Sequence, residues 1–209
     1  MNLDTYTHLL FDFGGVIYRL DEDKTFSQLA PYFDCATKDV MPLLIERARF
    51  YEYECGKIST DTFISAVQHA VVKPLSRHDF IDIWNAMLLG FPIEHVSLLQ
   101  NVRKHFSIHL LSNTNELHVQ AFEENMRKQG IVYTLHDLFD NVWYSHEIHR
   151  RKPDTLTYTH VMNHANIEPS QTLFLDDKPE NLRGAEQAGV DTVHIDSNNS
   201  IMHICKAYR

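Results

Sequence analysis

The hydrophobic and polar positions along the chain follow two patterns. Short, nearly continuous apolar runs are typical of strands that are covered on both faces of a sheet. Longer segments, in which apolar residues recur every three or four positions, are typical of amphipathic helices. The apolar runs lie at residues 8–13, 107–112, 142–145, 172–177 and 192–196.

Helical patterns with recognisable ends separate the later apolar runs. The first covers residues 115–129 and is closed by Gly130. The second covers 154–165, and the third, 179–188, carries a proline in its first turn and stops before Gly189. Because strands and helices alternate here, the second half predicts a doubly wound, mostly parallel α/β sheet.

The stretch from residue 20 to residue 89 breaks this alternation. Its apolar residues recur at helical spacing without a strand-like run, so the pattern predicts about four helices. Ser59 and Ser76 are the expected N-caps of two of them. We therefore predict a core domain of residues 1–19 and 90–209, interrupted by a helical domain of residues 20–89.

Composition and charge narrow the classes of function. Hydrophobic residues make up 44% of the 209 residues and charged residues 22%, as in ordinary globular proteins. The formal net charge of -9 argues against a nucleic-acid partner, because phosphate backbones require clustered Lys and Arg. No apolar stretch approaches the roughly 18 residues of a membrane span, so no membrane partner is expected.

The start of the chain and its cysteines bear on location. The first apolar run is short and has acidic neighbours, which predicts the absence of a signal peptide. The three cysteines are widely separated and lack a CxxC spacing, so neither a disulfide framework nor a zinc site is expected. These features favour a cytoplasmic protein.

Polar residues with useful chemistry directly follow the apolar runs. Ligands of an open α/β sheet bind outside the carboxyl ends of its strands, so we expect these residues to converge. Lys152, in "HRRKPD", stands a few residues past another run and just before a predicted helix. The remaining candidates are Asp12, Ser112, Asn113, Asp176 and Asp177.

This combination of side chains suits phosphoryl transfer. A carboxylate can act as nucleophile, a divalent cation can neutralise the phosphoryl oxygens, and a lysine and a hydroxyl can hold them. Asp176 and Asp177 are adjacent acids at a strand end, where they repel each other and favour a bound cation.

Four segments of the chain resemble the motifs of the haloacid dehalogenase (HAD) superfamily, in the same order. "LLFDFGGV" matches the first motif except at one position, and "HLLSN", "RRKPD" and "LFLDDKPEN" match the other three. They are most similar to bacterial sugar phosphatases of the glucose-1-phosphate type and to the phosphatase domain of soluble epoxide hydrolase. The resemblance implies a Rossmann-like core with an inserted type C1 cap, and a Mg²⁺-dependent phosphatase.

The resemblance also implies a nucleophile and a set of metal ligands. Asp12 would attack phosphorus and form an aspartyl-phosphate, which water then hydrolyses. Mg²⁺ would be bound by the Asp12 carboxylate, the backbone carbonyl of Gly14 and Asp177, with Asp176 bound directly or through water.

The resemblance assigns the phosphate to a second group of residues. Ser112 and the backbone N–H of Asn113 would hold phosphoryl oxygens, and Lys152 would pair with both the phosphate and the nucleophile. Gly14 and Gly15 would let the backbone approach the phosphate closely.

One position departs from the pattern of the superfamily. The residue two after the nucleophile is commonly a second Asp, which protonates the leaving alcohol, and here it is Gly14. General acid–base catalysis is worth about 10²- to 10⁴-fold, so the site favours leaving groups that depart easily. Sugar 1-phosphates, acyl phosphates and aryl phosphates meet this condition. We predict a small phosphorylated metabolite as substrate, for example a hexose 1-phosphate.

Two alternative functions stay open at this point. A metal-independent 2-haloacid dehalogenase also uses an Asp nucleophile without a second Asp, although crowded carboxylates argue against a site without a cation. A catalytically inactive, phospho-ligand-binding HAD protein would explain the loss of the acid at Gly14. In each case the chain is expected to be a monomer or a weak homo-oligomer.

Other conspicuous residues receive plain structural interpretations. His146 and His149 could share a helical turn, but no third ligand is identifiable, so a metal site is not expected there. Arg150 and Arg151 are expected on a solvated face. The aromatic residues of "RFYEYECGKIS" fit the core of the helical domain, although loops near "ECGKIS" select the substrate in similar family members.

Overall fold

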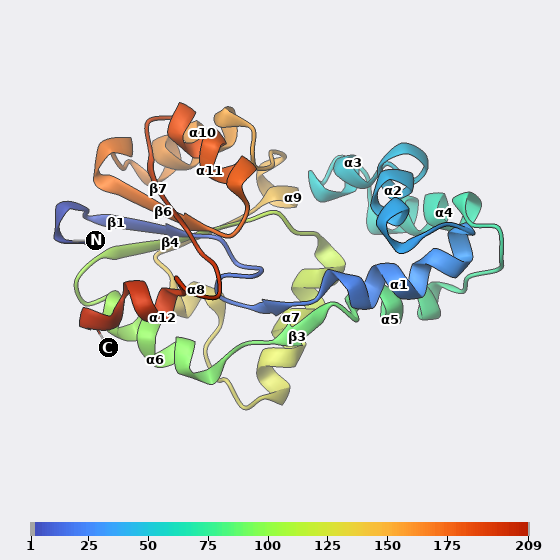
Figure 1. The fold of residues 1–209 in the computed structure, drawn as a ribbon, viewed down its shortest axis with the longest axis horizontal. Coiled ribbons are helices and arrows are strands. Elements are labelled where there is room, and N and C mark those ends of the chain that lie inside the picture. Colours follow the sequence, from blue (N-terminus) through green and yellow to red (C-terminus); the bar gives the residue numbers. More distant parts are fainter. Residues whose placement is uncertain (1–2, 209) are drawn as a thin grey trace.

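A parallel five-stranded sheet forms the centre of the computed structural model, which describes residues 3–208 (Figure 1). The strand order is β5-β4-β1-β6-β7, so β1 lies in the middle. The predicted core range, 1–19 and 90–209, extends beyond the described residues at both ends. The strands are β1 (His8–Phe11), β4 (Ser107–Ser112), β5 (Asn141–Tyr144), β6 (Thr172–Asp176) and β7 (Asp191–His194).

Helices cover both faces of this sheet, which explains the continuous apolar runs. Leu9 and Phe11 belong to the apolar cluster on one face, whereas Leu10 belongs to the cluster on the other. The predicted doubly wound α/β fold is therefore confirmed. One face carries α6 (Ile93–Val102), α7 (Glu116–Lys128), α8 (Leu135–Leu138) and α12 (Ile201–Ile204); the other carries α10 (Thr155–Ala165) and α11 (Pro179–Gln187).

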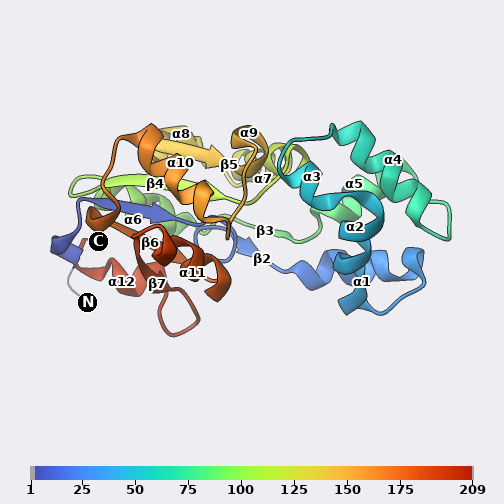
Figure 2. The same cartoon turned by 90° about the horizontal axis from the view of Figure 1, so that it is seen from above.

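A group of five helices lies beside the sheet, between β1 and α6 along the chain (Figure 2). It packs around its own apolar cluster, which includes Phe63, Phe80 and Trp84. The two short strands β2 (Arg19–Leu20) and β3 (Leu88–Gly90) pair antiparallel and join it to the sheet. We call residues 20–89 the helical insertion. Its helices are α1 (Glu22–Phe33), α2 (Val40–Ala48), α3 (Phe50–Glu54), α4 (Thr60–Ala70) and α5 (Arg77–Asn85).

Two expectations about this insertion were wrong. It contains five helices rather than four, because Arg49 alone, in the left-handed conformation (φ 59°), separates α2 from α3. The five residues of α3 are too few to show a helical period. The strands at its ends were missed because two or three residues cannot display an alternating pattern.

Short elements complete the chain. Helix α9 (Ser145–Ile148) follows β5 directly. Within residues 3–208, no helix combines the length and the apolar character that crossing a membrane requires. Turns of 3₁₀ helix lie at Leu3–Thr5, Thr37–Asp39, Pro169–Gln171 and Lys206–Tyr208.

The predicted N-caps of the insertion are confirmed. The Ser59 hydroxyl accepts from the backbone N–H of Thr62 (3.2 Å), and the Ser76 hydroxyl accepts from that of Asp79 (3.1 Å). Such a cap is worth about 1 kcal/mol, because it satisfies a donor that the helix leaves unpaired. Helix α4 and helix α5 therefore begin where the sequence indicates.

Helix α7 connects the insertion to the sheet layer. Its first turn contributes Leu117 to the apolar cluster of the insertion, whereas Phe122 and Met126 belong to the cluster under the sheet. The His118 ring stacks on Trp84 of α5, with 5.1 Å between ring centroids. One helix therefore takes part in both apolar clusters.

A buried histidine in β4 makes the stability of the fold depend on pH. His109 Nε2 lies 3.4 Å from His8 Nδ1, and His109 Nδ1 lies 3.2 Å from Asn141 Nδ2. Burial, reinforced by the neighbouring His8, lowers the pKa of His109 to about 4. Between the usual histidine pKa of about 6.5 and this value, the unfolded chain binds a proton that the folded chain does not.

We therefore expect the free energy of unfolding to fall as the pH drops from 7 to 5, and to fall less in His109→Phe. Urea titrations at pH 7, 6 and 5 measure the difference, with the exposed His136→Phe as the matched control. An equal loss of stability in the wild type and in His109→Phe would contradict the assignment.

Candidate active site

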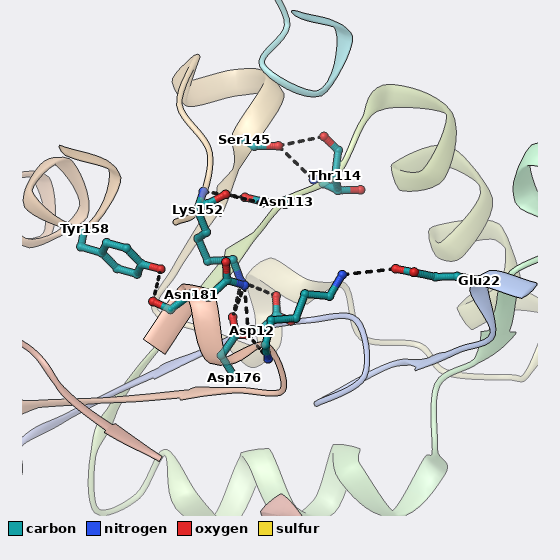
Figure 3. Close-up of polar contacts among 10 residues, drawn as sticks. Asp12, Glu22, Asn113, Thr114, Ser145, Lys152, Tyr158, Asp176 and Asn181 are labelled. Atoms are coloured by element: carbon teal, nitrogen blue, oxygen red, sulfur yellow. Dashed lines mark hydrogen bonds and ion pairs between the residues drawn. The ribbon is translucent and has the colours of Figure 1, made fainter. Parts of the chain in front are cut away.

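A buried lysine links two acids at the carboxyl edge of the sheet (Figure 3). Lys152 Nζ donates to Asp12 Oδ1 (2.5 Å) and to Asp176 Oδ2 (2.7 Å). Asp12 follows the last residue of β1, and Asp176 ends the neighbouring β6, so the strand order brings the two acids together. Lys152 reaches them from the loop between α9 and α10. The expected convergence is what the structure shows for these three residues.

The charges of this cluster depend on one another. Burial raises the pKa of Asp12 to about 7, against the lowering effect of Lys152. Burial alone would lower the pKa of Lys152, but the carboxylates of Asp12 and Asp176 raise it above its usual value. The lysine therefore stays charged, and a bound dication would return Asp12 to the fully ionised form.

The two adjacent acids have different surroundings. Asp176 is fully buried, and its oxygens accept from Lys152 Nζ, from the Lys178 backbone N–H (2.7 Å) and from Asn181 Nδ2 (3.0 Å to each oxygen). Asp177 Oδ1 is buried without a hydrogen-bond partner. Burial and the nearby Asp176 raise the pKa of Asp177. The hydrogen bonds of Asp176 thus hold Lys152 in position, whereas Asp177 has a carboxylate oxygen available for a ligand.

The acidic cluster fits a magnesium ion. Asp12, Asp176 and Asp177 each contribute a carboxylate oxygen, and these oxygens lie within 4.8 Å of one another. Carboxylate oxygens are the ligands that Mg²⁺ prefers in proteins. The orphaned Asp177 oxygen is the atom that such an ion would satisfy. No other group of three or more candidate ligands occurs within residues 3–208, and the pair His146 and His149 is not part of one.

Gly15 allows the backbone to reach this cluster. Its φ is +81°, a conformation that side chains rarely adopt, and an added Cβ would lie 2.4 Å from Asp177 Oδ2. Gly14 also lines the cavity above the cluster, and there a Cβ would meet Leu20 Cδ1 at 2.3 Å. A side chain at either position would therefore clash with a neighbouring residue, which the sequence alone did not reveal.

Ser112, the last residue of β4, and Asn113, which follows it, occupy different places. Asn113 lines the cavity and fixes the backbone of Lys152, because its Oδ1 accepts from Lys152 N (2.9 Å) and its Nδ2 donates to Lys152 O (2.9 Å). Sequence reasoning missed this role of the Asn113 side chain. Ser112 is buried at the end of β4 and is not among the residues that line the cavity. A phosphate-binding role for Ser112 stays a prediction.

A cavity of about 750 Å³ opens above the cluster, between the sheet and the helical insertion. Phe50 and Tyr51 of α3 line it, whereas Tyr53 stacks on Phe63 inside the insertion (4.2 Å between centroids). The other residues from the insertion and its connecting strands are Leu20, Glu22, Phe26, Met41, Glu54, Trp84 and Met87.

The expectation that Arg151 lies on a solvated face was wrong. Its guanidinium forms an ion pair with the buried Glu54 and lies over the Tyr51 ring, 4.1 Å from the centroid. Glu54 was missed as well, since one acid in "YECGKIS" carries no signal of burial or pairing. Both residues line the cavity.

Comparison with known proteins supports this description. The sequence profile of the haloacid dehalogenase-like hydrolase family matches residues 123–195. The chain is 25% identical to a D-ribitol-5-phosphate phosphatase of Bacteroides thetaiotaomicron over 88% of this chain and 89% of that protein. It is 24% identical to a sesquiterpene phosphatase of Aspergillus oryzae, over 91% and 90% of the respective chains.

A solved structure has the same architecture. It is a haloacid dehalogenase family enzyme of Bacteroides thetaiotaomicron in complex with magnesium and inorganic phosphate. The TM-score is 0.78 at 25% identity, over 95% of this chain and 98% of that one. The fold and the acidic cluster resemble those of haloacid dehalogenase-like hydrolases. The profile match and the two phosphatase relatives support a phosphatase of that superfamily, as the motifs predict.

The crowding of Asp177 leads to a test of the metal site. We expect Asp177→Asn to raise the melting temperature without Mg²⁺, because it removes a buried charge that repels Asp176. In the wild type, Mg²⁺ at about 100 times its dissociation constant should add about 2.7 kcal/mol of stability. That corresponds to a rise of about 5 °C or more, which Asp177→Asn should lose.

Thermal denaturation with and without Mg²⁺ measures both effects. The exposed Asp82→Asn serves as the control and should keep the shift with Mg²⁺. A full Mg²⁺-induced shift in Asp177→Asn would contradict its assignment as a ligand.

Proposed function

We propose that this phosphatase hydrolyses a small sugar phosphate, such as a hexose 1-phosphate, through an aspartyl-phosphate on Asp12. The observation that carries the proposal is the buried Lys152 ammonium between Asp12 and Asp176, beside the unpartnered oxygen of Asp177. A cation next to a strand-end carboxylate can hold a phosphoryl group against that carboxylate. Buried polar atoms usually have a hydrogen-bond partner, so an ion-pair network that binds no ligand does not explain the unpartnered oxygen of Asp177.

Asp12 is the nucleophile in this proposal. Its carboxylate oxygen forms a bond to phosphorus while the bond between phosphorus and the ester oxygen breaks, and the departing oxygen keeps the electron pair and takes a proton from solvent. Water then attacks the phosphorus of the aspartyl-phosphate and loses a proton to solvent, which releases inorganic phosphate and restores the carboxylate. Mg²⁺, the cofactor of this phosphatase, neutralises charge on the phosphoryl oxygens when it is bound.

Other residues hold the phosphoryl group and the metal. Lys152 pairs with phosphoryl oxygens and keeps Asp12 oriented, while the side chain of Asn113 fixes the backbone that carries the lysine. Asp177 is a metal ligand, with the Gly14 carbonyl as another. Ser112 and the backbone N–H of Asn113 bind the phosphate, as the resemblance implies.

We also propose that the helical insertion is a cap over the core. Support comes from its separate apolar cluster and from the cavity that it shares with the catalytic residues. A cap excludes water from the reacting phosphoryl group and contacts the leaving group. The division into residues 20–89 and the rest of the chain follows from this assignment.

The site favours a sugar phosphate as substrate because it requires a leaving group that departs without a proton donor. Gly14 offers no proton to the departing oxygen, and the anomeric hydroxyl of a sugar is more acidic than an ordinary alcohol. The similarity to a D-ribitol-5-phosphate phosphatase supports a polyhydroxy leaving group. The cavity of about 750 Å³ has room for one such molecule.

The function is tested with a panel of phosphorylated metabolites. We expect Mg²⁺-dependent release of inorganic phosphate, with the highest kcat/KM on a sugar phosphate. Asp12→Asn should reduce the release to the background rate, because it removes the nucleophile. Chloride release from a 2-haloacid in the presence of chelator, without phosphate release from any ester, would contradict the proposal.

The missing acid is tested by restoring it. A carboxylate at position 14 needs room, so the variant is Gly14→Asp combined with Leu20→Ala, and Leu20→Ala alone is its control. We expect the restored acid to raise kcat on alkyl phosphates by about tenfold or more, with little change on p-nitrophenyl phosphate. An equal change on both kinds of ester would show that no proton donor is lacking.

A further inference from the structure

Two ion pairs flank the cavity above the catalytic cluster. In each pair the cation comes from the core and the carboxylate from the cap. Arg151 pairs with Glu54, and Lys178 pairs with Glu22 at 3.3 Å. Arg151 directly precedes Lys152 in the chain, and Lys178 directly follows the acidic pair. These charged side chains, which line the cavity where a leaving group would lie, therefore neutralise each other in pairs.

The Arg151 side chain has hydrogen-bonding capacity to spare. Its Nε donates to Glu54 Oε2, and its guanidinium lies over the ring of Tyr51. A guanidinium carries five N–H donors. Within residues 3–208, neither Nη of Arg151 has a protein hydrogen bond, and the side chain is 27% exposed. Arg151 lines the same cavity as Lys152, so these donors are available to a molecule bound there.

The backbone holds Glu54 in place opposite Arg151. The Glu54 carbonyl accepts from the Ser145 hydroxyl (2.7 Å), and the Cys55 carbonyl lies 3.0 Å from His149 Nδ1. Gly56 packs so closely that a Cβ there would lie 2.0 Å from the His146 carbonyl oxygen. The geometry of the ion pair is therefore set by the loop that follows α3.

The charge balance of the cavity is unfavourable for a second anionic group on a ligand. Five carboxylates line it but only three cations, Arg151, Lys152 and Lys178, and each of these cations has a carboxylate partner. Mg²⁺ and Lys152 serve the phosphoryl group itself. A further carboxylate or phosphate on the leaving group would face Glu54 and Glu22 without a cation of its own.

We propose that the Arg151–Glu54 pair determines specificity by binding hydroxyl groups of an uncharged leaving group and rejecting a leaving group with a second anionic group. A hydroxyl can accept from Arg151 Nη and donate to the Glu54 carboxylate, so both partners are used without any net charge. The inference rests on the proposed phosphatase function. It narrows the substrates to esters whose only anionic group is the phosphate.

Two substrate pairs isolate the second anion from the chemistry of the ester. The first is α-D-glucose 1-phosphate against α-D-glucuronate 1-phosphate, and the second is glycerol 3-phosphate against 3-phosphoglycerate. Each pair shares the type of ester bond and differs in one carboxylate. We expect the wild type to favour the neutral member in kcat/KM by about tenfold or more, because like charges meet in the complex with the other.

The two members of the ion pair should change this preference in opposite directions. Glu54→Gln frees the Arg151 charge and should reduce the preference for the neutral ester by about tenfold. Arg151→Gln leaves Glu54 without its partner and should strengthen the rejection of the carboxylate. Because burial raises the pKa of Glu54 and Arg151 lowers it, the ratio is measured at alkaline pH, where Glu54 stays ionised in the variant. A ratio of two kcat/KM values does not depend on the fraction of folded enzyme, so partial misfolding cannot imitate this result.

A matched variant outside the cavity completes the experiment. Glu124→Gln makes the same chemical change in an exposed ion pair with Lys128 on α7, and should leave the ratio unchanged. Equal kcat/KM for both members of each pair, or shifts of Glu54→Gln and Arg151→Gln in the same direction, would overturn the inference alone. Failure of the wild type to hydrolyse any phosphate ester, and also acetyl phosphate, an acyl phosphate with a good leaving group, would overturn the proposed function and the inference with it.

Discussion

The buried contact of Lys152 with Asp12 and Asp176 is the constraint on which the site depends. One ammonium and two carboxyl groups are held away from water, and a charge on any of them is tolerated only because the others compensate it. The contact also fixes positions: Asp176 is bound by Asn181, Lys152 is bound through its backbone by Asn113, and Asp12 is thereby oriented. Removal of one member would leave an unpaired buried charge, so these residues are required for the stability of the fold as well as for the site.

The parallel sheet supplies these residues because of its strand order. With β1 between β4 and β6, the residues after three apolar runs meet at one edge. This is why the fold and the acidic cluster could be predicted from the chain. Continuous apolar runs reveal strands that are covered on both faces, and the residue after each run is then located by topology. The N-caps Ser59 and Ser76 were equally legible, since a cap is a local interaction.

Contacts between distant segments could not be predicted in this way. Arg151 resembled a solvated arginine because its partner, Glu54, lies 97 positions away in a segment without periodicity. The side-chain role of Asn113 depends on a backbone that approaches it only in the folded chain. Strands of two and three residues give no pattern at all. The part of the cavity that the sequence did not predict is therefore the side formed by the helical insertion, rather than the side formed by the acidic cluster.

Helix α7 has a mechanical consequence for the molecule. Leu117 in its first turn is buried in the apolar cluster of the insertion, and Phe122 and Met126 in its later turns are buried in the cluster under the sheet. Because α7 packs against both the insertion and the sheet, a movement of one is transmitted to the other. A rotation of the insertion relative to the sheet must bend α7, move α7 with it, or break the contacts of Leu117 and the His118–Trp84 stack. The insertion is therefore less free to move away from the sheet than the two-stranded connection of β2 and β3 alone would allow.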